Sequence, residues 1–439
     1  MVEIYAVGGY DEVGKNCTVI KVGDEAVMLD MGVHIENYIR YTEDEELIAV
    51  RPSELIKAEA VPDISFIEDL RKKIKAIIPT HAHLDHLGAI PYLGNKFKVP
   101  IIGTAFTTEV LKRILKDDRI KLNNKIKTLS ANSSYKISEN IKVEFINTTH
   151  STPQTVMVAV HTKKGVVLYA NDFKFDLFPV LGKKPNFKRL EELGKQGVLA
   201  LILDSTYAAE NRKTPSENVA REMLKDVLSI PAKNGVIVVT TFSSHLARLK
   251  SIIEFGKKIN REVVFLGRSL YKYVRAGEKI GIINFTKDVK LFRFSRQIKK
   301  ILEKVERDRE RYLLVVTGHQ GEPKAVLAKM VRKDFNFNFC ANDHIIFSCK
   351  TIPTDTNIRN RNDLERELKE YGVRIFKDIH QSGHAAREDL RDLIKLVKPE
   401  HIIPAHGDKE MENALADLAF EEGYKVDNVH IMKDGQKIS

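Results

Sequence analysis

The segment Thr80-His81-Ala82-His83-Leu84-Asp85-His86 constrains this chain more than any other feature of its sequence. It follows the apolar run 74–79, which predicts a buried strand, and it precedes the run 87–93, which predicts the start of a helix. A loop in this position lies at the carboxyl end of a strand, where an open α/β sheet usually holds its chemistry. Imidazole and carboxylate groups are good zinc ligands, and a turn can aim alternate side chains at different points. We therefore expect His81 and His83 to point to one metal ion and Asp85 and His86 to another; a polar surface loop is the disfavoured alternative.

The charge of the chain favours an acidic partner. Its 439 residues suffice for two or three domains, and 71 Lys and Arg against 60 Asp and Glu give a net charge of +11. Nucleic acid is the first candidate, and a solvated lysine-rich surface is the alternative that charge alone leaves open. The three cysteines form no CxxC pair and favour a reducing, cytoplasmic location. No signal peptide is expected at the start, and no apolar run reaches the roughly 18 residues that a membrane span needs.

Four further apolar strands in the first part of the chain also end in an acid or a histidine. These strands are predicted at 26–32, 141–146, 165–172 and 198–203, and they place Asp30, His150, Asp172 and Asp204 at or near their ends. His150 can complete the ligand set of the first metal and Asp172 can bridge both metals. Asp30 can brace the loop 80–86, called the metal loop below, through hydrogen bonds, or it can be a simple turn aspartate. Five such strand ends are easier to explain if they share one site. The polar stretch 35–70 between these strands is expected to be an irregular surface excursion.

A second pattern begins near residue 209. Apolar strands are predicted at 236–240, 263–266, 313–316 and 344–347, with amphipathic helices between some of them. This alternation is typical of a doubly wound parallel sheet that forms a domain of its own. Small hydroxyl residues, a histidine and an arginine follow the first two strands: Ser243, Ser244, His245, Arg268 and Ser269. Hydroxyl groups and backbone N–H groups at helix starts can bind phosphates, and Arg268 adds a forked donor. Ordinary helix capping is the alternative at any one of these loops.

Two more histidines lie near the C-terminal end of the sequence. Residues 381–390 predict the start of a helix that runs to about Val397, so the N–H groups of Ser382 and Gly383 are expected to face an anion. His384 in the same segment is expected to face the substrate. The run 402–408 predicts a strand that ends in a turn with His406, which suits the second metal.

With these residues in place, the chain resembles the ribonuclease J family in the β-CASP group of metallo-β-lactamase nucleases. The likeness covers nearly the whole chain. It is carried by the segments 8–16, 81–86, 171–176, 204–206, 318–323, 382–388 and 404–408, together with His150. The resemblance implies an αββα metallo-β-lactamase sandwich with an inserted doubly wound parallel-sheet β-CASP domain. The expected domains are 1–208 and 371–439 for the metallo-β-lactamase part and 209–370 for the insert.

The resemblance also implies two zinc ions and their ligands. His81, His83 and His150 would hold one, Asp85, His86 and His406 would hold the other, and Asp172 would bridge them. A metal-bound hydroxide would attack the phosphorus. The expected catalytic residues are Asp85, His384 and Asp204, with His384 contacting the scissile phosphate and Asp204 orienting it.

The resemblance implies a zinc-dependent ribonuclease that degrades single-stranded RNA from 5′ to 3′. A closed pocket near the metals would hold a terminal phosphate, which predicts a preference for a 5′-monophosphate. Only 33 residues follow His406, and this short form resembles the archaeal members of the family. The RNA targets, additional endonuclease activity, a homodimer and the use of manganese stay open. A hydrolase of small thioesters or lactones is disfavoured by the insert and the charge. An RNA-binding subunit without activity is disfavoured because all seven ligand residues are present.

Overall fold

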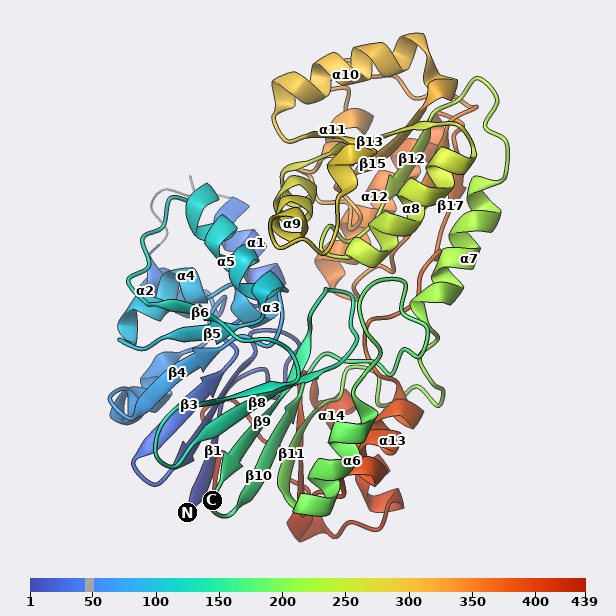
Figure 1. Cartoon of the computed structure of the whole chain (residues 1–439). Helices are drawn as coiled ribbons and strands as arrows, with labels where there is room; N and C mark the ends of the chain where they lie inside the picture. Colours follow the sequence, from blue (N-terminus) through green and yellow to red (C-terminus); the bar gives the residue numbers. More distant parts are fainter. Residues whose placement is uncertain (44–50) are drawn as a thin grey trace. The chain divides into compact units, whose positions relative to one another are not determined.

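The computed structural model describes residues 1–43 and 51–439, and it divides into two compact units (Figure 1). Unit 1 comprises residues 1–177, 182–214 and 382–439, and unit 2 comprises residues 178–181 and 215–381. The chain therefore leaves unit 1 and returns to it, as expected for an inserted domain. The second unit ends later than the predicted residue 370, because β17 (Arg374–Phe376) pairs with β16 (His344–Phe347) in its sheet.

Unit 1 contains two sheets. The first has the order β19-β1-β2-β3-β4-β5-β6 and the second has the order β18-β11-β10-β9-β8-β7. The strands of the first are β1 (Val2–Gly8), β2 (Cys17–Val22), β3 (Glu25–Leu29), β4 (Ile74–Ile78), β5 (Ile101–Gly103), β6 (Ile126–Thr128) and β19 (Lys437–Ile438). The strands of the second are β7 (Ser133–Lys136), β8 (Lys142–Asn147), β9 (Val156–Thr162), β10 (Gly165–Ala170), β11 (Val198–Asp204) and β18 (His401–Ala405).

The two sheets pack face to face through one apolar core. Ile20 and Ile78 of the first sheet belong to the same buried cluster as Val158, Val167 and Ile202 of the second. A separate cluster covers the other face of the second sheet with α6 (Phe187–Gln196), α13 (Arg387–Val397) and α14 (Lys409–Glu421). On the first sheet, α5 (Ala105–Asp117) contacts β5 and β6. Helices thus flank two sheets, and the expected αββα fold is confirmed.

Strand pairing brings distant segments of unit 1 to one sheet edge. β10, β11 and β18 are parallel neighbours, with Ala170 opposite Leu203 and Asp204 opposite Ala405. The carboxyl ends of parallel strands meet at the same edge of a sheet. Residues that follow Ala170, Leu203 and Ala405 are therefore neighbours, although some 235 positions separate the first from the last in the sequence.

Unit 2 has one six-stranded sheet in which every pairing is parallel. Its order is β14-β13-β15-β12-β16-β17. Besides β16 and β17, the strands are β12 (Ile237–Thr240), β13 (Glu262–Leu266), β14 (Lys290–Phe292) and β15 (Tyr312–Val316). Helices α10 (Ser295–Arg307), α11 (Val326–Val331) and α12 (Asp355–Glu370) share a core with Val264 of β13. Gly256 of α8 (Leu246–Lys258) instead lies against Val263, which points to the opposite face. Helices on both faces confirm the doubly wound sheet.

The expectation for residues 35–70 is wrong where the structure describes them. This stretch contains α1 (Ile35–Glu43), α2 (Pro52–Lys57) and a 3-10 helix at Ile64–Leu70, and residues 44–50 lie outside the described part. Leu55, Ile67 and Leu70 are buried. These apolar positions are too sparse to give a clear helical period, so short helices that pack through one or two residues escaped prediction.

Gly32 follows β3, and its lack of a side chain allows the backbone of the metal loop at Asp85 to approach closely. A Cβ atom at this position would lie 1.7 Å from the carbonyl oxygen of Asp85. The Gly32 N–H group also donates to the carbonyl of Asn16 at 3.0 Å, so the backbone cannot move away without losing that bond.

We predict that Gly32→Ala destabilises unit 1 by at least about 2 kcal/mol. The added methyl group would clash with backbone atoms of Asp85, which cannot move aside as a side chain could. Gly23→Ala is the control, since a Cβ there meets nothing within 4 Å and only the left-handed φ of +61° opposes it. Thermal unfolding monitored by circular dichroism measures both variants. Equal melting temperatures for the two would contradict the close approach of the loop.

Candidate active site

The local backbone explains how the metal loop serves two groups of ligands. His83 has an extended conformation, with φ −77° and ψ 152°, and caps the short helix α3 (Leu84–Leu87). Asp85 and His86 lie on this helix, so the chain turns between the first two histidines and the last two ligand residues. The predicted change of direction within the loop is therefore produced by a strand-to-helix turn.

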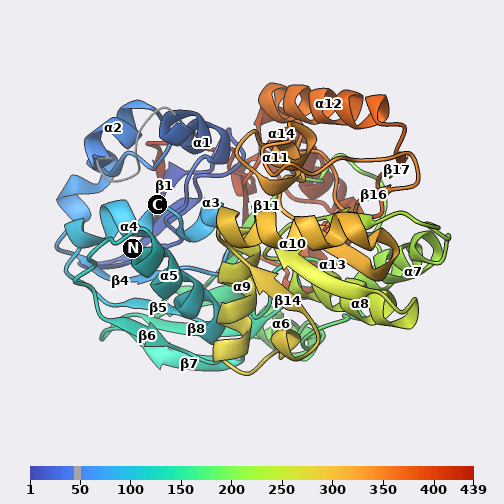
Figure 2. The same cartoon turned by 90° about the horizontal axis from the view of Figure 1, so that it is seen from above.

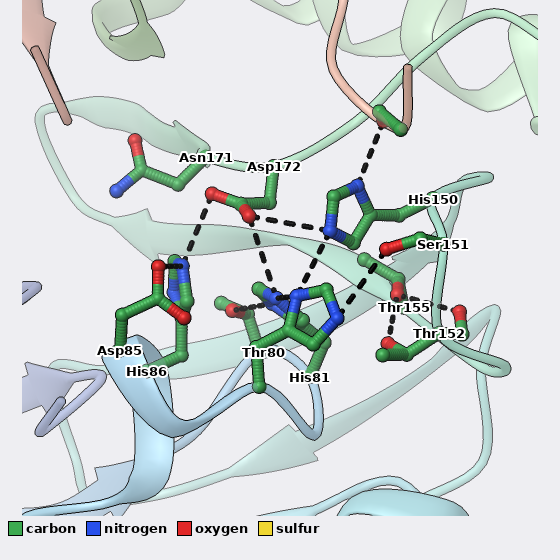
Figure 3. Close-up of polar contacts among 12 residues, drawn as sticks. Thr80, His81, Asp85, His86, His150, Ser151, Thr152, Thr155, Asn171 and Asp172 are labelled. Carbon is green, nitrogen blue, oxygen red and sulfur yellow. Dashed lines mark hydrogen bonds and ion pairs between the residues drawn. The ribbon is translucent and has the colours of Figure 1, made fainter. Parts of the chain in front are cut away.

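Four ligand atoms converge in the first group. The Nδ1 atom of His83 lies 3.1 Å from Nε2 of His81 and 3.1 Å from Nε2 of His150. The Oδ2 atom of Asp172 lies 3.5 Å from Nε2 of His81 and 3.3 Å from Nε2 of His150. Figure 3 shows Asp172 beside His81 and His150. The group draws on β4, β8 and β10, through the loops that follow them.

A second group forms on the other oxygen of the same carboxylate. The Oδ1 atom of Asp172 lies 3.0 Å from Nε2 of His86 and 3.3 Å from Nε2 of His406. Asp85 contributes Oδ2 at 3.7 Å from Nε2 of His86 and 3.8 Å from Nε2 of His406. The structure thus brings all seven predicted ligand residues together. Asp172 belongs to both groups: one of its oxygens faces His86 and the other faces His150 (Figure 3).

The dimensions of both groups fit a metal ion. Four ligands at the 2.0–2.1 Å typical of zinc are about 3.4 Å apart when they form a tetrahedron. The first group has separations of 3.1–3.5 Å and the second 3.0–3.8 Å for the pairs given above. The buried Oδ1 atom of Asp172 faces the Nε2 atoms of His86 and His406. A buried, ionised carboxylate needs positive charge close by, and a cation held between these atoms would supply it.

Burial and neighbouring charges set the protonation of these groups. Burial lowers the pKa of His81 and His150 well below the usual value, and it lowers the pKa of His83 to about 4. Burial acts the same way on His86, but the carboxylates of Asp172, Asp30 and Asp85 outweigh it and raise its pKa well above normal. Neutral imidazoles and ionised carboxylates are the forms that bind metal, and a cation in the second group would replace the proton on His86.

Asp30 supports the metal loop from below. It is fully buried and accepts hydrogen bonds from the Thr80 N–H at 2.7 Å and from the Thr80 hydroxyl at 3.0 Å. Its Oδ2 atom lies 2.7 Å from Nδ1 of His86. An imidazole that donates Nδ1–H to a carboxylate keeps a lone pair on Nε2. In His86, Nε2 is the nitrogen that faces the second group.

Asn16 is a site residue that the sequence did not reveal. Its side-chain amide is 1% exposed and donates to the carbonyl of Asp85 at 3.1 Å. It also lies 3.0 Å from Nδ1 of His406, and its Oδ1 atom accepts from Asn171 at 3.2 Å. Asn16 thereby links the metal loop to the ends of β10 and β18. The glycine-rich segment 8–16 was recognised in the sequence, but nothing in its pattern singled out this amide.

His384 and Asp204 form a pair beside the two groups. Nδ1 of His384 lies 2.8 Å from Oδ2 of the buried Asp204, and its Nε2 lies 3.8 Å from Oδ2 of Asp172. Burial lowers the pKa of His384, but Asp172 and Asp204 outweigh burial and raise it to about 9. A protonated imidazole at this place can interact with an anion or donate a proton from Nε2.

Ser382 and Gly383 do not open the helix that the sequence predicted at this point. Helix α13 begins at Arg387 with Ala386 as its cap, so these two residues lie several positions before it. Their polar groups are also engaged: the Ser382 hydroxyl accepts from the His384 N–H at 3.1 Å, and the Gly383 carbonyl lies 2.7 Å from Nδ1 of His150. The segment therefore orients two histidines instead of presenting N–H groups at a helix start.

The candidate phosphate loops of unit 2 are only partly accessible. The hydroxyls of Ser243 and Ser269 lie 2.8 Å apart, and Arg268 is exposed at the start of α9 (Arg268–Lys279). Ser244 and His245 are buried, however, and His245 caps α8 by accepting from the Arg248 N–H. Helix capping, the alternative prediction for this loop, explains the position of His245. Ser243, Arg268 and Ser269 are not buried and can reach a ligand.

Comparisons with known proteins agree with this geometry. Residues 10–208 match the model of the metallo-beta-lactamase superfamily, residues 234–363 match "Ribonuclease J, beta-CASP domain", and residues 366–432 match "Zn-dependent metallo-hydrolase RNA specificity domain". A crystal structure of a protein from Enterococcus faecalis V583 has a TM-score of 0.65 and covers 100% of this chain and 99% of its own, at 16% identity. That likeness concerns the fold alone.

Curated relatives extend over the whole chain. Ribonuclease J of Methanocaldococcus jannaschii is 40% identical over 100% of this chain and 98% of its own length. Ribonuclease J of Pyrococcus abyssi is also 40% identical, over 100% of this chain and 97% of its own length. Ribonuclease J 2 of Staphylococcus epidermidis is 30% identical over 100% of this chain and 74% of its own length.

The fold and the clustered histidines and aspartates define a metal-dependent hydrolase of the metallo-β-lactamase superfamily. The full-length similarity narrows this class. The chain belongs to the ribonuclease J family and is a metal-dependent ribonuclease. Among the described residues, no helix is long and apolar enough to cross a membrane.

We predict that Asp30→Asn weakens metal binding by about 10- to 100-fold, because an amide cannot accept from both Thr80 and His86. The measurement is a zinc titration against a chelating dye. Glu144→Gln is the matched control, since Glu144 is a buried carboxylate that binds His161 and Arg189 instead. Wild-type affinity in both variants would show that Asp30 does not orient the ligand.

Proposed function

We propose that the chain is a zinc-dependent 5′-to-3′ exoribonuclease that uses two zinc ions per chain. The observation that carries the proposal is the pair of four-ligand groups joined by Asp172, with His384 beside them. His81, His83, His150 and Asp172 would hold one ion, and Asp85, His86, His406 and Asp172 would hold the other. When bound, zinc lowers the pKa of a water molecule and neutralises charge on the phosphate.

The protein's own groups orient and protonate the substrate. Asp204 accepts Nδ1–H of His384, which fixes the direction of the ring and leaves Nε2 to carry the second proton. A protonated His384 can donate from Nε2 to an oxygen of the scissile phosphate or to the leaving 3′ oxygen. Asp85, whose side chain is 20% exposed, is the ligand carboxylate with most access to solvent and can accept a proton from the attacking water.

The RNA contacts in unit 2 are proposed on chemistry and exposure. The Ser243 and Ser269 hydroxyls share a hydrogen bond at 2.8 Å, so the one that accepts keeps its own O–H to donate to a phosphate, and Arg268 can donate a fork of two N–H groups. The 5′-to-3′ direction rests on the resemblance to the family. The 5′-monophosphate preference rests on the expectation that Ser382, Gly383 and His384 form a closed pocket for the terminal phosphate. A cytoplasmic location is proposed from the sparse, unpaired cysteines.

Loss of His83 tests the first ligand group. His83→Ala should abolish RNA cleavage and lower the bound zinc while leaving the fold largely intact by circular dichroism, because His83 is a loop residue outside the apolar core. Gel assays and metal analysis by mass spectrometry measure the two effects. His161→Ala is the control, since His161 pairs with Glu144 outside the ligand groups and should retain full activity. Full activity in His83→Ala would exclude the two-metal assignment.

The 5′ terminus of the RNA tests the direction of degradation. A 5′-monophosphate RNA should be degraded to mononucleotides faster than a 5′-triphosphate RNA, because the longer phosphate chain adds bulk and charge at the point of entry. RNAs labelled at either end and separated on a denaturing gel reveal the direction and the product size. A circular RNA of the same sequence should persist. If the circle is cut as fast as the linear RNA, the protein is mainly an endonuclease.

A further inference from the structure

The positive charge of the chain is concentrated in one stretch of unit 2. Residues 268–300 contain ten Lys or Arg and two Asp or Glu, so they supply most of the net charge of +11. Both acids are already engaged: Glu278 pairs with Arg275 at 2.9 Å and Asp288 pairs with Lys257 at 2.6 Å. Much of the remaining positive charge lies on the surface, where four of the side chains are exposed: Arg268, Arg296, Lys299 and Lys300.

This stretch also contains two aromatic rings that stack against the same arginine guanidinium group. The guanidinium carbon of Arg293 lies 4.6 Å from the ring centre of Tyr271 and 4.5 Å from that of Phe294. Arg275 contacts Tyr271 from its own helix at 5.5 Å. Phe294 is 50% exposed, so its ring is accessible to a ligand. We call Tyr271, Arg275, Arg293 and Phe294 the aromatic platform.

The fold places the platform where doubly wound sheets bind ligands. β13 and β14 are parallel neighbours, with Leu266 opposite Phe292, and the Gly267 N–H donates to the Phe292 carbonyl at 2.9 Å. Arg268 and Arg293 therefore begin the segments that leave the carboxyl ends of adjacent strands. Helix α9 contacts β14, and β14 leads into α10 (Figure 2). Ligands of open parallel sheets bind outside this edge.

We propose that the aromatic platform binds single-stranded RNA by stacking a base on Phe294 while the surrounding arginines and lysines contact its phosphates. The inference rests on the proposed function insofar as it takes RNA to be the substrate. Every base has a flat face that can stack on an aromatic ring, so such a surface binds RNA without regard to sequence. An acidic protein would suit the charge but gives no reason for an exposed ring held by a guanidinium.

The chain has no tryptophan, and this makes a direct test available. Phe294→Trp introduces the only tryptophan, and stacking of a base should quench its fluorescence. Phe420→Trp is the matched control, because Phe420 is 42% exposed on α14 of unit 1. The full-length protein would carry His83→Ala in addition, so that a 20-nucleotide uridine RNA stays intact during the titration.

We expect the RNA to quench the fluorescence of the Phe294→Trp variant but not that of the Phe420→Trp variant. Phe294→Ala should weaken binding of the same RNA about tenfold in fluorescence anisotropy, as loss of one stack does, whereas Phe420→Ala should not. The inference is overturned if the RNA binds without quenching, if Phe294→Ala binds as tightly as the parent, or if polyglutamate quenches equally. Failure of the proposed function is separate: it would appear as uncut RNA with the otherwise unaltered protein.

Discussion

The arrangement of the ligand residues in unit 1 centres on one buried carboxylate, that of Asp172. Its side chain is 1% exposed and faces imidazole nitrogens on both oxygens. Burial would raise its pKa, but the nearby His86, His406 and His384 outweigh burial and hold the pKa well below normal. An ionised carboxylate in a dry environment needs positive charge close by, and the surrounding histidines can supply it only as protons or as bound metal. The clustering of the ligands is therefore an electrostatic requirement as well as a geometric one.

Two edges of the sandwich meet this requirement. The first sheet delivers the loop after β4, braced by Asp30, and the second sheet delivers His150, Asp172 and His406 after β8, β10 and β18. His150 comes from the antiparallel part of that sheet and reaches the same edge because β8 and β10 both pair with β9 in the opposite direction. The apolar core between the sheets fixes their separation, so the ligand atoms are positioned by the packing of residues such as Ile78 and Val158.

The sequence predicted much of this because its ligands follow strongly apolar strands. His81, His150, Asp172 and His406 could each be placed at a strand end from local pattern alone, and the parallel sheet of unit 2 followed from alternation of strands and helices. The interactions that could not be predicted join segments that are far apart in the sequence and meet only in the folded protein. Asn16 acquires its role only when β1 and β2 bring its amide to His406, and Ser382 lies outside its expected helix because the chain first turns to place the Gly383 carbonyl against His150.

The sharing of Asp172 between two metal ions is the central claim of this account. Its most direct test is the zinc content of purified Asp172→Asn, Asp85→Asn and the unaltered protein, measured by mass spectrometry after identical dialysis. The account predicts two zinc ions in the unaltered protein, about one in Asp85→Asn and nearly none in Asp172→Asn, with all three folded by circular dichroism. Equal loss in the two variants, or a single ion in the unaltered protein, would contradict it.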